Sequence, residues 1–139
     1  MIAPYDAIQG NEPRQPRILI VDDCPNSCRL FVEVLGLEGF NAYSVSNPLR
    51  AYDAAVEVRP DLIILDYMMP YLTGEDLFRI FRIMPAVVAT PVIFMSASGA
   101  KVRELLDLFR SQGASGMLVK PFSLDDLCSR VAEALGSAR

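Results

Sequence analysis

The chain has 139 residues, of which 52% are hydrophobic and 22% charged, which fits one globular domain with its own core. The net charge of −4 argues against nucleic acid as the main partner, and the absence of histidine excludes histidine-based catalysis and histidine-ligated zinc. No apolar stretch reaches the ~18–20 residues that span a bilayer, and residues 1–16 lack the pattern of a signal peptide, so we expect a cytoplasmic protein.

Residues 1–16 contain three prolines and are expected to form a flexible N-terminal arm. The apolar run 17–21 predicts a first strand. A helix is predicted over 25–38, because proline suits its first turn and glycine follows its end. The apolar stripe of this helix is expected to consist of Leu30, Val34 and Leu37.

Two further strands are predicted over 40–45 and 61–65, and the second is apolar throughout, as is typical of a strand covered on both faces. Between them, a helix that buries small residues follows the cap at Asn47. Thr73 begins the cap of another helix, which runs to Met84. The expected stripes are Ala51, Ala54, Ala55 and Val58 on the former helix and Leu77, Ile80 and Phe81 on the latter.

In the last part of the chain, predicted strands again alternate with predicted helices. Strands are predicted over 91–95 and 116–119, with a helix over 101–112 between them. Ser123 caps a final helix, and residues 137–139 form a short tail. The expected stripes are Val102, Leu105, Leu106 and Phe109 on the first of these helices and Leu124, Leu127, Val131 and Leu135 on the second.

Five strands that alternate with five helices predict an α/β fold, a single doubly wound domain over residues 17–136 with a parallel sheet between two layers of helices. Ligands of such sheets bind at the carboxyl ends of the strands. The polar residues at these ends are Asp22 and Asp23 after the first strand, Asp66 after the third, Ser96 after the fourth and Lys120 after the fifth.

Three carboxylates at one edge of a sheet repel one another unless a cation neutralises them. Hard oxygen ligands with room for water suit Mg²⁺, which we expect Asp22 and Asp23 to hold. The central carboxylate of Asp66 is then placed to act as a nucleophile toward a phosphoryl group. Lys120 and the Ser96 hydroxyl would contact the phosphoryl oxygens.

These residues, in the order Asp22-Asp23, Asp66 within LDYMMP with Gly74 downstream, Ser96-Ala97 and Lys120-Pro121-Phe122, resemble the receiver domain of bacterial two-component response regulators. The resemblance covers roughly residues 17–136. It implies a flavodoxin-like fold with strand order 2-1-3-4-5. It also implies a cis peptide bond between Lys120 and Pro121.

The resemblance further implies that Asp66 is the phosphoacceptor. It implies Mg²⁺ bound by Asp23, Asp66 and the backbone carbonyl of Met68, with Asp22 assisting through water. The phosphoryl group would come from a sensor histidine kinase, a histidine phosphotransfer protein or a small acyl phosphate, and phosphorylation would change a surface that binds an unknown protein target. Apart from this phosphotransfer to itself and its own dephosphorylation, no enzyme activity is expected.

One position departs from the family pattern. The family usually has Tyr or Phe three residues before the lysine, and this ring moves inward with the Ser or Thr on phosphorylation. The chain has Met117 there. Ser96 therefore keeps one half of the predicted switch, whereas Met117 lacks the ring of the other half.

Three alternative functions differ in what they require. A phosphohydrolase of the haloacid dehalogenase type would need a second aspartate two residues after Asp66, where Met68 stands. A nucleotide or flavin binder would need a phosphate-accepting loop where Asp22 and Asp23 repel phosphate. A pseudo-receiver that only binds partners is favoured by Met117 alone.

Some features leave two interpretations open. Cys24 and Cys28 lie four residues apart near a helix start and serve either packing or redox chemistry, while Cys128 is expected to fill space. Leu108 lies outside its helix stripe and is either a partly exposed leucine or part of a dimer or partner face.

About three residues follow the last helix, so we expect a stand-alone receiver or one excised from a longer protein, with no output domain in this chain.

Overall fold

The computed structural model describes residues 14–137, so most of the predicted arm (1–13) and residues 138–139 of the predicted tail lie outside the described part. Arg14 donates two hydrogen bonds of 3.0 Å to the Asp61 carboxylate. The N–H of Asn41 donates to the carbonyl of Pro16 at 2.9 Å. Residues 14–16, which the sequence assigns to the arm, are therefore attached to the domain.

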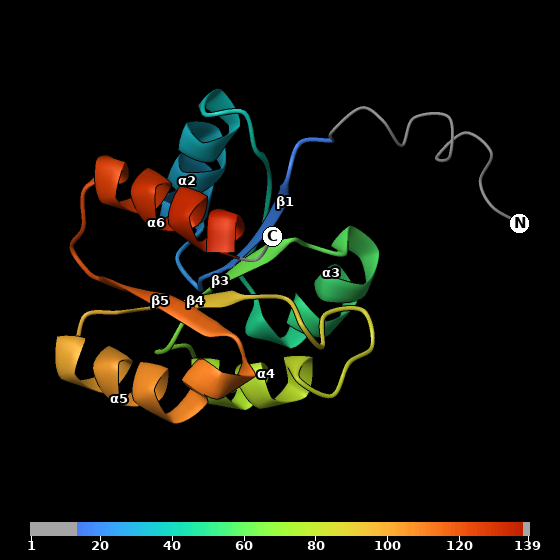
Figure 1. The fold of residues 1–139 in the computed structure, drawn as a ribbon, viewed down its shortest axis with the longest axis vertical. Coiled ribbons are helices and arrows are strands. Elements are labelled where there is room, and N and C mark those ends of the chain that lie inside the picture. The colour runs from blue at the N-terminus through green and yellow to red at the C-terminus, as the bar shows by residue number, and fades with distance from the viewer. Residues whose placement is uncertain (1–13, 138–139) are drawn as a thin grey trace, which may run out of the picture.

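Five parallel strands form one sheet in the order β2-β1-β3-β4-β5, which confirms the predicted flavodoxin-like topology. Helices α2 and α6 cover one face of the sheet, and α3, α4 and α5 cover the other (Figure 1). The strands are β1 (Arg17–Val21), β2 (Asn41–Val45), β3 (Leu62–Asp66), β4 (Val92–Ser96) and β5 (Ala114–Val119). The helices are α2 (Pro25–Leu37), α3 (Ala51–Val58), α4 (Gly74–Phe81), α5 (Gly99–Phe109) and α6 (Leu124–Ser137), with short 3₁₀ turns η1 (Pro48–Arg50) and η2 (Arg110–Gln112).

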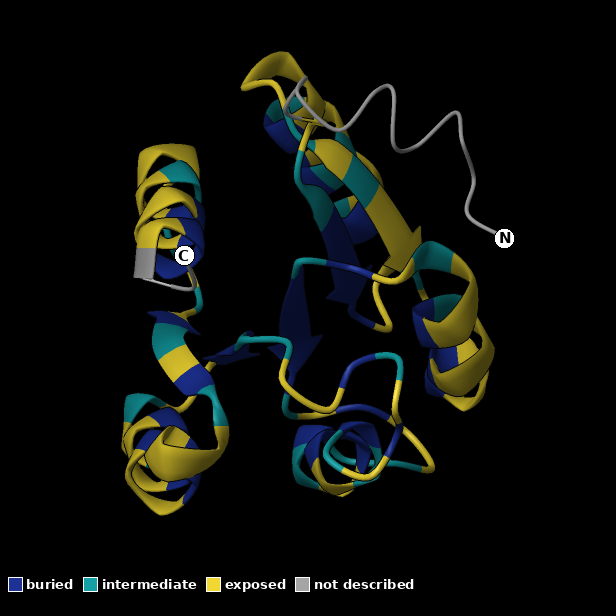
Figure 2. Cartoon of the chain, turned by 45° about the vertical axis from the view of Figure 1, so that its right-hand side comes forward, coloured by how far each residue is buried: buried dark blue, intermediate teal, exposed yellow. Residues whose placement is uncertain are grey.

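The central strands are buried on both sides, because every residue of β3 and β4 is shielded from solvent. Successive side chains of a strand point to opposite faces, so each central strand contributes side chains to two separate cores. Leu65 and Phe94 belong to the core under α3, α4 and α5, whereas Ile64 and Met95 belong to the core under α2 and α6. Figure 2 shows the buried central strands between helices whose outer surfaces are exposed.

The apolar stripe predicted for α2 is wrong. Leu30 and Leu37 are 45% and 84% exposed, and the residues that α2 buries are Cys28, Phe31 and Leu35. The ring of Phe31 stacks on that of Phe122 at 5.5 Å between centroids. Because Phe122 comes from the distant segment before α6, the local pattern of α2 could not identify this contact.

The predicted helix over 101–112 begins earlier and ends earlier in the structure. The Ser98 hydroxyl accepts a hydrogen bond from the N–H of Lys101 at 3.2 Å and caps α5, which starts at Gly99. After Phe109 the chain tightens into η2, and Gly113, at φ 96°, redirects it into β5. Glycine adopts this left-handed conformation without steric cost.

Candidate functional site

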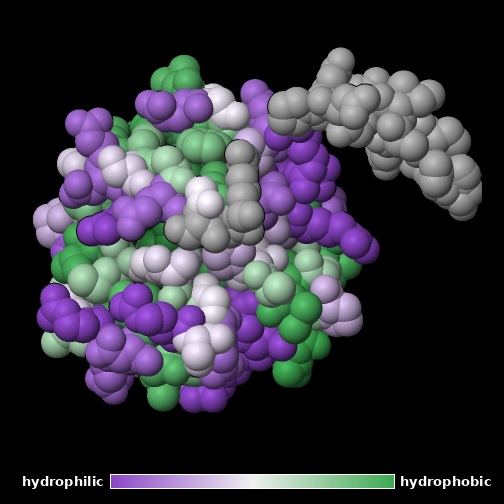
Figure 3. Space-filling view, viewed as in Figure 1, coloured by the Kyte–Doolittle hydropathy of each residue, from purple (hydrophilic) through white to green (hydrophobic). Residues whose placement is uncertain are grey.

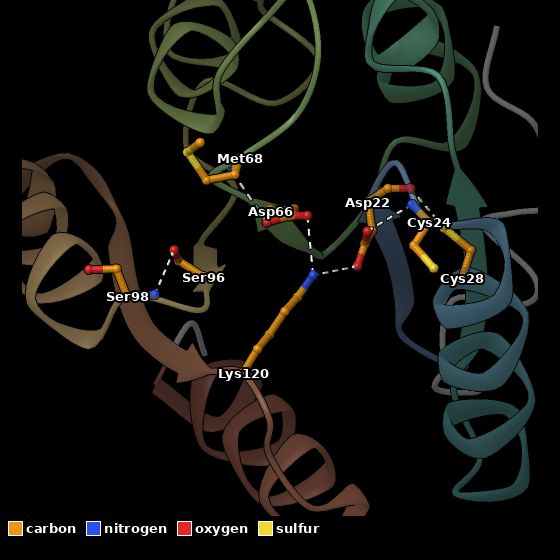
Figure 4. A network of polar contacts seen from close by, with 8 residues as sticks. All are labelled: Asp22, Cys24, Cys28, Asp66, Met68, Ser96, Ser98 and Lys120. Carbon is orange, nitrogen blue, oxygen red and sulfur yellow. Dashed lines mark hydrogen bonds and ion pairs between the residues drawn. The ribbon is translucent and has the colours of Figure 1, made fainter.

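The structure brings the predicted site residues together at one edge of the sheet (Figure 4). Asp22 directly follows β1, Asp66 and Ser96 end β3 and β4, and Lys120 directly follows β5. Asp22, Asp66 and Ser96 are almost completely buried. Parallel strands end at the same edge, and β1 and β3 flank the point where the strand order reverses, so these side chains meet where such sheets bind ligands.

Lys120 joins the two buried carboxylates. Its Nζ lies 3.2 Å from Oδ2 of Asp22 and 3.2 Å from Oδ2 of Asp66. Burial acts to lower the pKa of Lys120, but Asp66 and Asp22 outweigh it and raise that pKa above its ordinary value. Lys120 therefore carries a positive charge at the edge of the acidic cluster.

Burial dominates the electrostatics of Asp66. It raises the pKa of this carboxyl to about 6 from an ordinary 3.8, because the charged form loses its hydration. Lys120 acts in the opposite direction, and the negative charge of Asp22 raises the pKa further. Asp66 is therefore ionised at neutral pH but at an energetic cost that a nearby cation would remove.

The three aspartates can share one cation. One carboxylate oxygen from each of Asp22, Asp23 and Asp66 lies within 4.8 Å of the others. Asp23 is exposed, so this side of the cluster is open to water, and hard oxygen ligands that leave room for water suit Mg²⁺. The donor set thus fits the predicted metal. The backbone N–H of Met68 donates to Oδ1 of Asp66 at 3.3 Å, and the role of its carbonyl as a ligand stays a prediction.

Gly74 holds the segment around Asp66 against the start of α4. Its N–H donates to the carbonyl of Tyr67 at 2.8 Å. A Cβ at this position would lie 2.6 Å from the carbonyl oxygen of Asp66 and 2.8 Å from Cα of Tyr67. Only glycine permits the backbone at position 74 to lie this close to the backbone of Asp66 and Tyr67. The sequence motif includes Gly74 but did not reveal this reason for it.

The two predicted switch residues lie on neighbouring strands. The Ser96 hydroxyl accepts a hydrogen bond from the N–H of Ser98 at 3.1 Å, and the Ser96 carbonyl accepts one from the N–H of Lys120 at 2.8 Å. Met117 is half-buried and packs against the core under α3, α4 and α5, beside Phe94. The peptide bond between Lys120 and Pro121, for which the sequence predicts the cis form, is cis.

Two cysteines contact the acidic cluster, which the sequence did not indicate. The backbone N–H of Cys24 donates to Oδ1 of Asp22 at 3.0 Å. The buried thiol of Cys28 donates to the carbonyl of Asp22 at 3.1 Å (Figure 4). Cys128 is half-buried and packs against the core under α2 and α6, as expected for a residue that fills space.

The outer surface mixes hydrophilic and hydrophobic side chains on the face shown in Figure 3. Leu108 is 56% exposed on α5, as expected for a residue outside the buried stripe, and its place in a dimer face stays a prediction. None of the helices within residues 14–137 is both long and apolar enough to cross a membrane.

Residues 18–132 match the family described as "Response regulator receiver domain". "DNA-binding response regulator MtrA" of Mycolicibacterium smegmatis is 36% identical over 115 residues, which cover 83% of this chain and 48% of that protein. "DNA-binding dual master transcriptional regulator RpaA" of Synechocystis is 32% identical over 84% of this chain and 47% of its own length. The chain therefore spans about half the length of these curated relatives.

Solved structures share the fold over almost their whole length. Chemotaxis response regulator CheY4 of Vibrio cholerae superposes with a TM-score of 0.77 at 25% identity, covering 86% of this chain and 98% of its own. A response regulator from Desulfuromonas acetoxidans gives a TM-score of 0.76 at 31% identity, covering 87% of this chain and 97% of its own.

Proposed function

Because the chain belongs to the family of response regulator receiver domains, we propose that Asp66 accepts a phosphoryl group and that this changes a partner-binding surface. The observation that carries the proposal is the setting of the Asp66 carboxylate. It is buried, 3.2 Å from the Lys120 ammonium, and within reach of a cation shared with Asp22 and Asp23.

The proposed reaction is an in-line displacement at the phosphorus atom of the donor. A carboxylate oxygen of Asp66 attacks the phosphorus, the bond from phosphorus to the donor breaks, and the donor leaves with the electron pair. The Lys120 ammonium is placed to neutralise charge on the phosphoryl oxygens, and the Ser96 hydroxyl can donate to one of them. Asp22, Asp23, Asp66 and the Met68 carbonyl would hold Mg²⁺, which when bound lowers the repulsion between the carboxylates and the incoming phosphoryl group.

A phosphohistidine of a sensor kinase or of a histidine phosphotransfer protein is the proposed donor, because membership of the receiver-domain family implies this donor. The proposed output is a protein contact rather than direct nucleic-acid binding. The curated relatives are DNA-binding regulators, whereas the matched region here is the receiver domain alone and the chain carries a net charge of −4.

The surface change would begin at Ser96 and Met117. Drawing the Ser96 hydroxyl toward a phosphoryl group would break its bond with the N–H of Ser98, which precedes α5. Met117 lies on the adjacent strand under the same helix and can rearrange because its side chain has three flexible bonds. The α5 side of the domain is therefore the proposed site of the response.

The test is intact mass after incubation with Mg²⁺ and acetyl phosphate. The wild-type protein should gain one phosphoryl group, and Asp66→Asn should gain none. Asp107→Asn, at an exposed aspartate on α5, is the matched control and should be labelled like the wild type. Labelling of Asp66→Asn would identify a different acceptor. No labelling of the wild type by either acetyl phosphate or a histidine phosphodonor would favour the pseudo-receiver.

A further inference from the structure

We propose that Cys24 and Cys28 form a dithiol site that peroxide oxidises to an intramolecular disulfide, and that this bond weakens cation binding at the neighbouring carboxylates. The formation of the bond concerns the two cysteines alone. Its effect on the cation rests on the proposed function, in which Asp22 is a metal-binding residue.

The two cysteines lie one helical turn apart at the start of α2. The N–H of Cys28 donates to the carbonyl of Cys24 at 3.1 Å. Cα atoms four residues apart in a helix are ~6 Å apart, within the ~4.4–6.8 Å that disulfides span. Helical side chains lean toward the N-terminus, and the Cys28 thiol accordingly reaches back to the Asp22 carbonyl at 3.1 Å, beside Cys24 (Figure 4).

Their different exposure gives them different roles. Cys24 is exposed and can meet a small oxidant, whereas Cys28 is only 3% exposed. Cys24 occupies the N-cap position with φ −93° and ψ 107°, and its side chain forms no capping hydrogen bond. Its carbonyl accepts the first hydrogen bond of α2, from the N–H of Cys28, so a movement of Cys24 disturbs only the end of the helix, where helices fray.

The proposed reaction balances with one peroxide per disulfide. The sulfur of Cys24 attacks one oxygen of hydrogen peroxide, the O–O bond breaks, and water leaves, which yields a sulfenic acid. The sulfur of Cys28 then attacks the sulfenic sulfur, the S–S bond forms, and a second water leaves. The two thiols lose two electrons, and the peroxide gains them.

Closing the bond displaces groups that hold Asp22. Cβ atoms four residues apart in a helix are ~5–6 Å apart, whereas those of a disulfide are ~3.5–4.5 Å apart, so Cys24 must shift toward Cys28. The Cys24 N–H that donates to Oδ1 of Asp22 moves with it, and the Cys28 thiol proton that binds the Asp22 carbonyl is lost. Asp22 thus keeps its ion pair with Lys120 but loses two of the contacts that fix its carboxylate beside Asp66.

Peptide mapping tests the bond directly. The protein is treated with hydrogen peroxide, its remaining thiols are alkylated after denaturation, and it is cleaved with trypsin. Both cysteines fall in the peptide 18–29, and Cys128 falls in the separate peptide 111–130. We expect peptide 18–29 to be unalkylated and to carry an internal disulfide, and peptide 111–130 to be alkylated.

Single variants check the pairing. Cys24→Ser and Cys28→Ser should each abolish the internal bond, whereas Cys128→Ser should keep it. Alkylation of both cysteines after peroxide, or irreversible oxidation of Cys24 without a bond to Cys28, would overturn the proposed dithiol.

Mg²⁺ titration followed by NMR tests the coupling. Oxidised protein should bind Mg²⁺ roughly tenfold more weakly than reduced protein, as expected for losing a hydrogen bond to a charged group, and a reductant should restore the affinity. In Cys28→Ser, peroxide should leave the affinity unchanged. A mapped disulfide with unaltered Mg²⁺ affinity would refute the coupling. Reduced protein that binds no Mg²⁺ would refute the metal site of the proposed function, while the mapped bond would still decide the dithiol.

Discussion

Replacing Asp66 with asparagine is expected to stabilise the protein in magnesium-free buffer at neutral pH. The pKa of Asp66 is raised from 3.8 to about 6, chiefly because burial removes the hydration of the carboxylate. A group with a raised pKa favours the folded state below its ordinary pKa, and this contribution is lost as the pH rises through the raised value. Folding therefore opposes the ionised form of Asp66 above about pH 6.

The size of the effect follows from the shift. At about 1.36 kcal/mol per pKa unit, a rise from 3.8 to about 6 corresponds to ~3 kcal/mol of unfolding free energy at neutral pH. The attraction of Lys120 is already contained in this pKa. Asparagine has nearly the same shape and no charge, so Asp66→Asn should gain ~1–3 kcal/mol when imperfect hydrogen bonding of the amide is allowed for.

Urea unfolding followed by far-ultraviolet circular dichroism, with a chelator present, measures the difference. The gain of Asp66→Asn over the wild type should be present at about pH 7.5 and should shrink toward zero at about pH 4. Asp107→Asn, at an exposed position, should show neither the gain nor its pH dependence. A variant less stable than the wild type at neutral pH, or a gain that does not change with pH, would refute the reasoning.

Four further outcomes are expected. Mg²⁺ should raise the wild-type melting temperature, and Asp23→Asn should weaken that rise because an exposed ligand is lost. Gly74→Ala should lose ~2–3 kcal/mol in urea unfolding, because its Cβ would lie 2.6 Å from a backbone oxygen. Lys120→Ala should still gain phosphoryl mass while the NMR shifts of α5 stay unchanged. Arg82→Met should lose ~2–4 kcal/mol in urea unfolding, because Arg82 donates to three carbonyls after α4.

The order of the elements could be predicted because it depends on local chemistry. Apolar runs such as 61–65 and 91–95 are typical of strands covered on both faces, and the structure buries every residue of β3 and β4. A strand end is also local information, so the parallel topology placed Asp22, Asp66, Ser96 and Lys120 at one edge of the sheet, and the strand order that makes their strands neighbours came from the family resemblance.

What the sequence could not determine depends on residues far apart in the chain. The buried side of α2 was predicted wrongly because Phe31 packs against Phe122, and both sides of that helix carry apolar residues. Arg82 was missed because the carbonyls that it binds belong to the loop after α4, and a loop conformation leaves no periodic pattern.

The sequence by itself determined which chemical groups meet, because the carboxyl ends of parallel strands share one edge. Only the tertiary structure decided how they meet: Lys120 lies 3.2 Å from both buried carboxylates, and Cys24 and Cys28 donate hydrogen bonds to Asp22. The physical reason is that the alternation of strands and helices along the chain makes the strands parallel and puts their carboxyl ends at one edge, whereas distances and burial depend on the packing of side chains from separate segments.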